Sequence, residues 1–151
     1  MELKSLEDTQ SFSQKISSIV GDGDIIFLYG EIGSGKTTFV RFFINYLENK
    51  NDIENSNIPS PTFNIVYDYE VKNIKISHYD LYRLKSYEEI YQLGMFEILK
   101  NQIKIIEWPE LIEPKPIDRI DILFKYSKNI NSRTAIIKGF GKWKDYQFNA
   151  I

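Results

Sequence analysis

The sequence contains no cysteine, a single histidine and no long run of apolar residues. Without cysteine, the chain has no disulfide, no catalytic thiolate and no cysteine-ligated zinc site. One imidazole alone makes a poor zinc site, so we interpret His78 as a hydrogen-bonded residue near the end of a strand. No apolar stretch approaches the roughly 18 residues of a membrane-spanning helix, and the first residues lack the apolar core of a signal peptide. We therefore expect a soluble, cytoplasmic protein that does not bind membranes.

A strong charge of either sign is also absent. The 151 residues include 19 basic and 21 acidic side chains, which give a formal net charge of −2 at pH 7. A protein that binds nucleic acid by itself is normally basic on at least one face, so this balance argues against that class. The length predicts a single domain, residues 1–151, large enough to bury about 70% of its unfolded surface in one core.

Residues 30–37 read GEIGSGKT and match the phosphate-loop pattern G-x-x-x-x-G-K-[ST]. Glycines allow the backbone to curl until successive N–H groups converge on a phosphate, whereas a Cβ atom would obstruct that approach. The N-terminus of the following helix also favours an anion. Lys36 can reach the β- and γ-phosphates as a point charge, and the Thr37 hydroxyl is placed to bind Mg²⁺. The pattern predicts a site for ATP or GTP.

The segments on either side of this phosphate loop have the character that the loop requires. Residues 24–29 (DIIFLY) are a short apolar run, typical of a buried parallel strand. Apolar residues recur at helical spacing through residues 38–47. Strand, loop and helix therefore follow one another in the expected order.

The rest of the chain predicts an α/β fold of the P-loop NTPase type, with a mixed β-sheet flanked by helices. Thr9 is placed to cap a first helix that ends at residues 21–23 (GDG). Residues 48–58 are polar and predict a surface connection. A capping box predicts a later helix that begins at Ser86. Further strands are expected at residues 62–71, 74–78, 103–106, 118–126 and 133–138.

A second nucleotide motif, N-K-x-D at residues 49–52, fits the guanine-recognition pattern of GTPases. It directly follows the helix after the phosphate loop, whereas the recognition motif should follow a late strand. The chain also contains no D-x-x-G segment. We therefore interpret residues 49–52 as a chance match and disfavour a GTPase.

Two carboxylates follow buried strands at the edge of the sheet where ligands gather. Glu107 ends the apolar run 103–106 and suits the acid that binds Mg²⁺ directly or through water. Asp80 can hold the same metal or orient the attacking water. Both residues also fit a simpler role as surface acids that cap strand ends. Trp108 is expected to form a wall beside the metal site.

Three further segments accompany the phosphate loop: SPTF at 60–63, HYDLYRL at 78–84 and IEWPE at 106–110. In this order, the four segments resemble the bacterial TsaE (YjeE) family of small P-loop ATPases, over about residues 9–139. The resemblance implies an ATPase that supports turnover of the TsaB–TsaD protein pair, which forms threonylcarbamoyladenosine in tRNA. It implies that tRNA is contacted only through that complex. Residues 142–146 have no counterpart in the resemblance.

By motif matching, the resemblance also implies a role for each site residue. Thr37 and Glu107 would hold Mg²⁺, and Asp80 would assist hydrolysis. Thr62 would lie on a segment that responds to the γ-phosphate of ATP, and Thr9 and Arg133 loosely match positions near the nucleotide. The residues implied to hold the phosphates are Gly33, Ser34, Gly35, Lys36, Thr37 and Thr38, and the implied catalytic residues are Lys36, Asp80 and Glu107.

Two other classes of function remain open. A small-molecule phosphotransferase shares the phosphate loop but needs a basic lid over its second substrate. The arginines of this chain are scattered along the sequence, at Arg41, Arg83, Arg119 and Arg133. A nucleotide-gated binding module would need no hydrolysis, and it would keep its biological activity when both strand-end acids are substituted.

Overall fold

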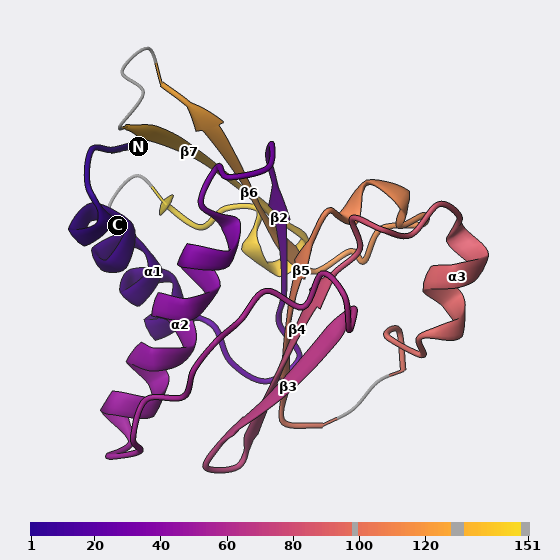
Figure 1. Cartoon of the computed structure of the whole chain (residues 1–151), viewed down its shortest axis with the longest axis horizontal. Helices are drawn as coiled ribbons and strands as arrows, with labels where there is room; N and C mark the ends of the chain where they lie inside the picture. The colour runs from indigo at the N-terminus through magenta and orange to yellow at the C-terminus, as the bar shows by residue number, and fades with distance from the viewer. Residues whose placement is uncertain (98–99, 128–131, 149–151) are drawn as a thin grey trace.

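Strand β2 (Ile25–Tyr29) lies in the middle of a mixed sheet that, among the described residues, has seven strands in the order β1-β7-β6-β2-β5-β4-β3. The computed structural model describes residues 1–97, 100–127 and 132–148. Helices α1 and α2 lie together on one face of the sheet, and α3 lies on the other side (Figure 1). The elements are β1 (Glu2–Leu3), α1 (Leu6–Ile19), β2 (Ile25–Tyr29), α2 (Lys36–Lys50), β3 (Val66–Val71), β4 (Ile74–Asp80), α3 (Tyr87–Gln92), β5 (Gln102–Glu107), η1 (Pro109–Leu111), β6 (Arg119–Tyr126), β7 (Arg133–Phe140) and η2 (Gly141–Trp143).

The strand register brings the ends of the central strands to one edge of the sheet. Strands β6, β2, β5 and β4 run parallel, and Leu28 of β2 pairs with Glu107 of β5. Glu107 in turn pairs with Asp80 of β4. Because parallel strands share the edge at which they end, the phosphate loop and both acids meet there. The predicted α/β fold with a mixed sheet is confirmed.

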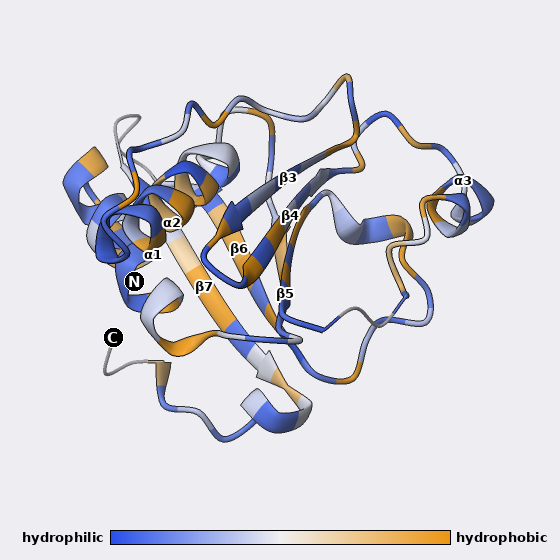
Figure 2. Ribbon diagram, turned by 90° about the horizontal axis from the view of Figure 1, so that it is seen from below, coloured by the Kyte–Doolittle hydropathy of each residue, from blue (hydrophilic) through white to orange (hydrophobic). Residues whose placement is uncertain are grey.

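The core forms on both faces of the sheet because side chains alternate along each strand. In β2, Leu28 faces the layer of α1 and α2, whereas Phe27 faces the layer of α3. Between sheet and helices, the ring of Phe39 lies 5.4 Å from that of Phe12 and 5.8 Å from that of Phe124, measured between centroids. Much of the hydrophobic colour in Figure 2 lies on β4, β6 and β7. The ring contacts of Phe39 hold α2 against the sheet, and the phosphate loop directly precedes the N-terminus of α2.

The first helix begins earlier than the sequence analysis predicts. Ser5, rather than Thr9, caps it, since the Ser5 hydroxyl accepts a hydrogen bond from the Asp8 backbone at 3.2 Å. The Asp8 carboxylate reaches back to the Lys4 backbone N–H at 2.8 Å. This reciprocal pair satisfies two backbone donors at once, so Thr9 falls inside α1 and its hydroxyl donates to the Ser5 carbonyl. The expected cap at Thr9 is wrong.

Other boundaries also differ from expectation. The predicted surface connection over 48–58 is wrong at both ends, because Glu48 belongs to α2 and is buried, and Ile58 is buried in the core. The Glu48 carboxylate accepts a hydrogen bond from the backbone of Ser56 at 2.9 Å, which holds the connection against the helix. Strand β3 begins at Val66 rather than at residue 62, because Ile65 adopts a positive φ of 68°.

The segment without a counterpart in the resemblance anchors the C-terminal region to the sheet. The indole Nε1 of Trp143 donates a hydrogen bond to the buried Asp24 carboxylate at 3.0 Å, and the Lys142 ammonium lies 2.8 Å from the same oxygen. Asp24 directly precedes β2, so this contact joins the C-terminal region to the central strand.

Among the described residues, no helix has both the length and the apolar character needed to cross a bilayer.

We expect Trp143→Phe to lower the free energy of unfolding by about 1–3 kcal/mol. The substitution keeps an aromatic ring in the core but removes a donor from a buried carboxylate. Urea denaturation measures the change. Tyr146→Phe is the matched control, because Tyr146 packs on the Trp143 ring and its loss of a half-exposed hydroxyl should cost less than about 0.5 kcal/mol. Equal stability of Trp143→Phe and the wild type would contradict the anchoring role.

Candidate nucleotide-binding site

The phosphate loop joins β2 to α2 and is held by the end of β6. Gly33 has a φ of 75°, and a Cβ atom there would lie 2.8 Å from the hydroxyl of Tyr126. That hydroxyl donates a hydrogen bond to the Ile32 carbonyl at 2.7 Å. Gly35 precedes α2 with a φ of 108°, which glycine adopts without strain. The curl of the loop therefore depends on glycine at both positions.

The side chain of Lys36 is buried and folds back onto the start of the phosphate loop. Its ammonium group donates hydrogen bonds to the carbonyls of Gly30 at 2.7 Å and Glu31 at 3.0 Å, and it lies 4.0 Å from the centre of the Trp108 ring. Burial lowers the pKa of Lys36, and the negative charge of Glu107 partly opposes that effect. An anion such as phosphate would further favour the charged ammonium. Trp108 forms the wall beside the site, as expected.

The hydroxyl of Thr37 and the carboxylate of Glu107 are in direct contact. Thr37 Oγ1 donates to Glu107 Oε1 at 2.8 Å. Its hydrogen is thereby committed, so the lone pairs of the hydroxyl are left for a cation. Hydroxyl and carboxylate oxygens are ligands that Mg²⁺ accepts, together with waters and phosphate oxygens. The donor set therefore fits the predicted metal, although no group of three or more acidic or histidine side chains forms a cage within the described residues.

Sequence reasoning missed a third member of this cluster. His78 Nε2 lies 2.8 Å from the same Glu107 oxygen, and the imidazole is fully buried. A signal was present, because His78 and Asp80 are two residues apart on β4 and side chains two apart on a strand point to the same face. The expectation of a hydrogen-bonded histidine is correct for Nε2.

Asp80 connects the end of β4 to the segment 60–63. Its Oδ2 accepts hydrogen bonds from the hydroxyls of Thr62 at 2.6 Å and Ser60 at 3.3 Å, and its Oδ1 accepts from the Tyr82 backbone at 3.0 Å. Asp80 is 3% exposed and Glu107 is 2% exposed. This burial argues against the simpler interpretation of both acids as surface caps.

These residues enclose a cavity of about 290 Å³, close to the lower limit for sites that bind small ligands. The phosphate loop forms one side, and the ends of β4 and β5 form the other. The lining residues are Ile32, Gly33, Gly35, Lys36, Thr37, Thr38, Ser60, Thr62, Asp80, Tyr82, Glu107 and Trp108. Among the described residues, the cavity thus combines backbone of the phosphate loop, one lysine and two acids.

Three predicted residues do not line this cavity. The Ser34 hydroxyl is buried without a hydrogen-bond partner in the described part of the chain, and the Thr9 hydroxyl is bonded to the Ser5 carbonyl. The guanidinium of Arg133 lies 4.3 Å from the centre of the Tyr126 ring. Tyr126 in turn contacts the phosphate loop through its hydroxyl. Their role in nucleotide binding stays a prediction.

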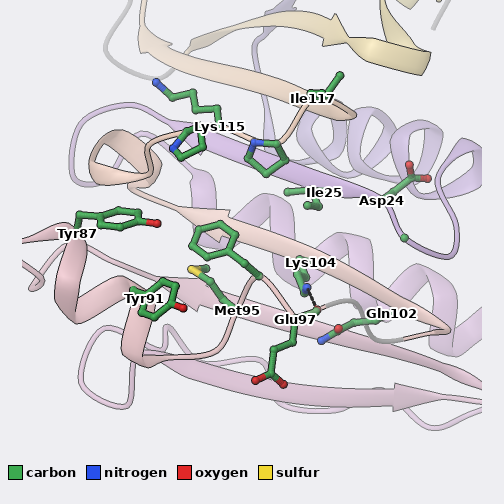
Figure 3. A pocket seen from close by; sticks show the side chains of 14 residues that line it. Asp24, Ile25, Tyr87, Tyr91, Met95, Glu97, Gln102, Lys104, Lys115 and Ile117 are labelled. Atoms are coloured by element: carbon green, nitrogen blue, oxygen red, sulfur yellow. Dashed lines mark hydrogen bonds between the residues drawn. The ribbon is translucent and has the colours of Figure 1, made fainter.

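A larger cavity of about 580 Å³ lies near α3 and shares no lining residue with the first (Figure 3). Aromatic and aliphatic side chains such as Tyr87, Tyr91 and Met95 form its walls. The Lys104 ammonium, beside it, donates to the Glu97 carbonyl at 2.9 Å. None of the predicted phosphate or metal ligands lines it, so the chemistry of the side chains, rather than cavity size, makes the smaller cavity the candidate nucleotide site.

Comparisons with known proteins agree with this geometry. The family model "Threonylcarbamoyl adenosine biosynthesis protein TsaE" matches residues 3–135. The chain is 40% identical over 123 residues to the protein TsaE of Rickettsia bellii, an alignment that covers 80% of this chain and 83% of that protein. The chain belongs to the TsaE family. The matched range includes every residue assigned above to the TsaE-like site, from Thr9 to Arg133, and ends before the Trp143 anchor.

Other TsaE relatives differ in how much of their length is matched. The Rickettsia conorii protein is 44% identical over 111 residues, which cover 74% of this chain and 61% of that protein. The chain therefore spans about three-fifths of the length of that relative. The Bacillus subtilis protein is 31% identical over 79% of this chain and 72% of its own length. The crystal structure of YdiB from Bacillus subtilis supports the fold alone, with a TM-score of 0.71 at 23% identity over 94% of this chain and 85% of that one.

Proposed function

We propose that the protein is a Mg²⁺-dependent ATPase that supports the formation of threonylcarbamoyladenosine in tRNA. One observation carries the proposal: a phosphate loop with a buried lysine faces two buried acids across a single cavity. Membership of the TsaE family supports the pathway, because its relatives are named for biosynthesis of this modified nucleoside.

Each group of the cavity has a distinct task in this proposal. Lys36 and the loop amides bind the β- and γ-phosphates, which concentrate negative charge. Thr37 and Glu107 would hold Mg²⁺, which when bound would neutralise charge on the transferring phosphoryl group. Asp80 accepts a hydrogen bond from the attacking water and orients it toward the γ-phosphate.

The mouth of the cavity supports coupling to a protein rather than to a metabolite. The lining residues Ile32 and Tyr82 are 65% and 50% exposed, and Phe63, which directly follows the lining residue Thr62, is 82% exposed. Exposed apolar groups around a site are typical of surfaces that other proteins cover. We propose the TsaB–TsaD pair as the partner, with tRNA contacted only through that complex.

A phosphotransferase finds less support. The Arg83 guanidinium lies 5.0 Å from the Phe63 ring centre, and Arg119 forms an ion pair with Asp121 at 3.0 Å. These arginines are engaged with neighbouring side chains instead of forming a basic lid over the cavity. A nucleotide-gated binding module that does not hydrolyse ATP is the second candidate, because the same cavity would serve nucleotide binding without hydrolysis.

We expect Thr62→Val to blunt the preference of the TsaB–TsaD pair for the ATP-bound protein over the ADP-bound protein. The substitution removes the hydroxyl that bonds Asp80, and a hydrogen bond to a charged group corresponds to roughly tenfold in an equilibrium. ATP affinity should change by less than about threefold, since segment 60–63 is not part of the phosphate loop. Thr62→Ser keeps the hydroxyl and is the matched control.

Pull-down or interferometry with each nucleotide measures the preference, and a multiple-turnover tRNA modification assay measures the function. The reconstituted reaction should stall after few turnovers when this protein is omitted. Absence of association in every nucleotide state, or full turnover without the protein, would overturn the proposed function.

A further inference from the structure

We infer that His78 is a positioning residue, whose Nε2–H orients the Glu107 carboxylate for Mg²⁺ binding. The inference rests on the proposed function, which makes Glu107 the acid that holds the metal. Neither the phosphate-loop pattern nor the family resemblance assigns a role to His78.

Glu107 Oε1 is held from two sides. Thr37, at the start of α2, donates to it at 2.8 Å, and His78, on β4, approaches it at 2.8 Å. No hydrogen bond from the described residues reaches the second oxygen, Oε2. The carboxylate is therefore clamped at one oxygen, which leaves the other to bind a cation or a water on that cation.

The surroundings of the imidazole decide which nitrogen carries its hydrogen. His78 Nδ1 is buried and has no hydrogen-bond partner in the described part of the chain. An N–H at Nδ1 would be an unsatisfied buried donor, and a lone pair at Nε2 would then face the negative carboxylate. The hydrogen therefore lies on Nε2, and the ring donates to Glu107.

The contact with Glu107 is the hydrogen bond of Nε2, and Nδ1 has no partner among the described residues. A buried imidazole with one unpaired nitrogen packs no better than an apolar residue of similar size. The distinctive contribution of His78 is its hydrogen bond to Glu107. His78 holds the carboxylate from strand β4, whereas Thr37 holds it from the start of α2. Groups that hold a metal-binding carboxylate from behind typically change metal affinity roughly ten- to a hundredfold when they are removed.

The first test measures how much Mg²⁺ strengthens nucleotide binding. Titration calorimetry with ADP and with AMP-PNP, each with Mg²⁺ or with EDTA, gives a ratio of dissociation constants for every variant. His78→Leu should reduce this ratio at least about tenfold, with Mg²⁺-free affinity within about twofold of the wild type. His78→Gln places an amide donor near the position of Nε2 and should restore most of the ratio.

The control variant lies next to His78 on the same strand. Ser77 faces the opposite side of the sheet, where its hydroxyl donates to Asp68 at 2.6 Å. Ser77→Ala perturbs the buried part of β4 without touching Glu107, so its Mg²⁺ ratio should match the wild type. A general loosening of β4 would weaken binding with and without Mg²⁺ equally and leave the ratio unchanged.

The second test needs neither nucleotide nor metal. His78 is the only histidine in the chain, so a ¹⁵N-histidine-labelled protein without a histidine tag gives the imidazole signals of this one residue. We expect the spectrum of the tautomer protonated at Nε2, with an Nε2–H proton signal that shifts in Glu107→Gln. The opposite tautomer would overturn the inference even if every variant folded poorly.

The outcomes separate the inference from the proposed function. If the wild type binds neither nucleotide, the proposed function fails and the positioning role fails with it. If the wild type shows Mg²⁺-dependent binding but His78→Leu keeps the full ratio, only the positioning role of His78 is overturned. A reduced ratio, its recovery in His78→Gln and the Nε2–H tautomer together support it.

Discussion

Replacing Lys36 by alanine is expected to weaken the binding of Mg-ATP roughly ten- to a hundredfold. A charge-assisted phosphate contact contributes about 1.5–3 kcal/mol, and each 1.4 kcal/mol corresponds to tenfold in affinity. The ammonium group already lies inside the curl of the phosphate loop, bonded to the carbonyls of Gly30 and Glu31. In the described part of the chain, no other lysine or arginine lines the cavity to replace it. Titration calorimetry measures the dissociation constant.

The matched control is Lys104→Ala. The Lys104 ammonium also donates to a backbone carbonyl, and burial also lowers the pKa of Lys104, but it lies beside the larger cavity near α3. This variant should keep the wild-type affinity for Mg-ATP. An unchanged dissociation constant for a Lys36→Ala protein that is folded by circular dichroism would overturn the assignment of the phosphate loop.

The second large effect is expected on the rate of hydrolysis. Asp80→Asn should lower kcat roughly a hundred- to ten-thousandfold, the range typical of a group that orients or deprotonates a reacting water. The amide is close in size to the carboxylate and can still accept the hydrogen bond from Thr62, so ATP affinity should stay near the wild-type value. Glu107→Gln should instead weaken the Mg²⁺ dependence of binding, since Glu107 contacts the Thr37 hydroxyl.

Phosphate release under steady-state and single-turnover conditions measures these rates. Asp68→Asn is the control, because the Asp68 carboxylate also accepts a hydrogen bond from a hydroxyl, that of Ser77, yet lies outside the cavity. Wild-type hydrolysis by Asp80→Asn would withdraw the role of Asp80. Retention of tRNA modification by the double variant Asp80→Asn/Glu107→Gln would favour a binding module that does not hydrolyse ATP.

The positions that the sequence predicted correctly depend on residues that are neighbours in the chain. The phosphate loop, the strand before it and the helix after it are one continuous segment, so the residue pattern and the hydrophobic periodicity of that segment are enough to predict them. Asp80 and Glu107 were placed at one edge of the sheet because each follows a predicted strand, and parallel strands end at a common edge. The capping box at Ser86 is equally local, and the structure confirms it.

By itself, then, the sequence determined the class of fold, the phosphate loop and the two acids that face it. Only the tertiary structure decided the contacts that join distant segments: His78 with Glu107, 29 residues apart, and Trp143 with Asp24, 119 residues apart. These contacts depend on which strands are neighbours, on their register and on the direction of each side chain. Local periodicity gives the face of a strand on which a side chain lies, but the neighbours and their register arise only when the whole sheet packs against its helices.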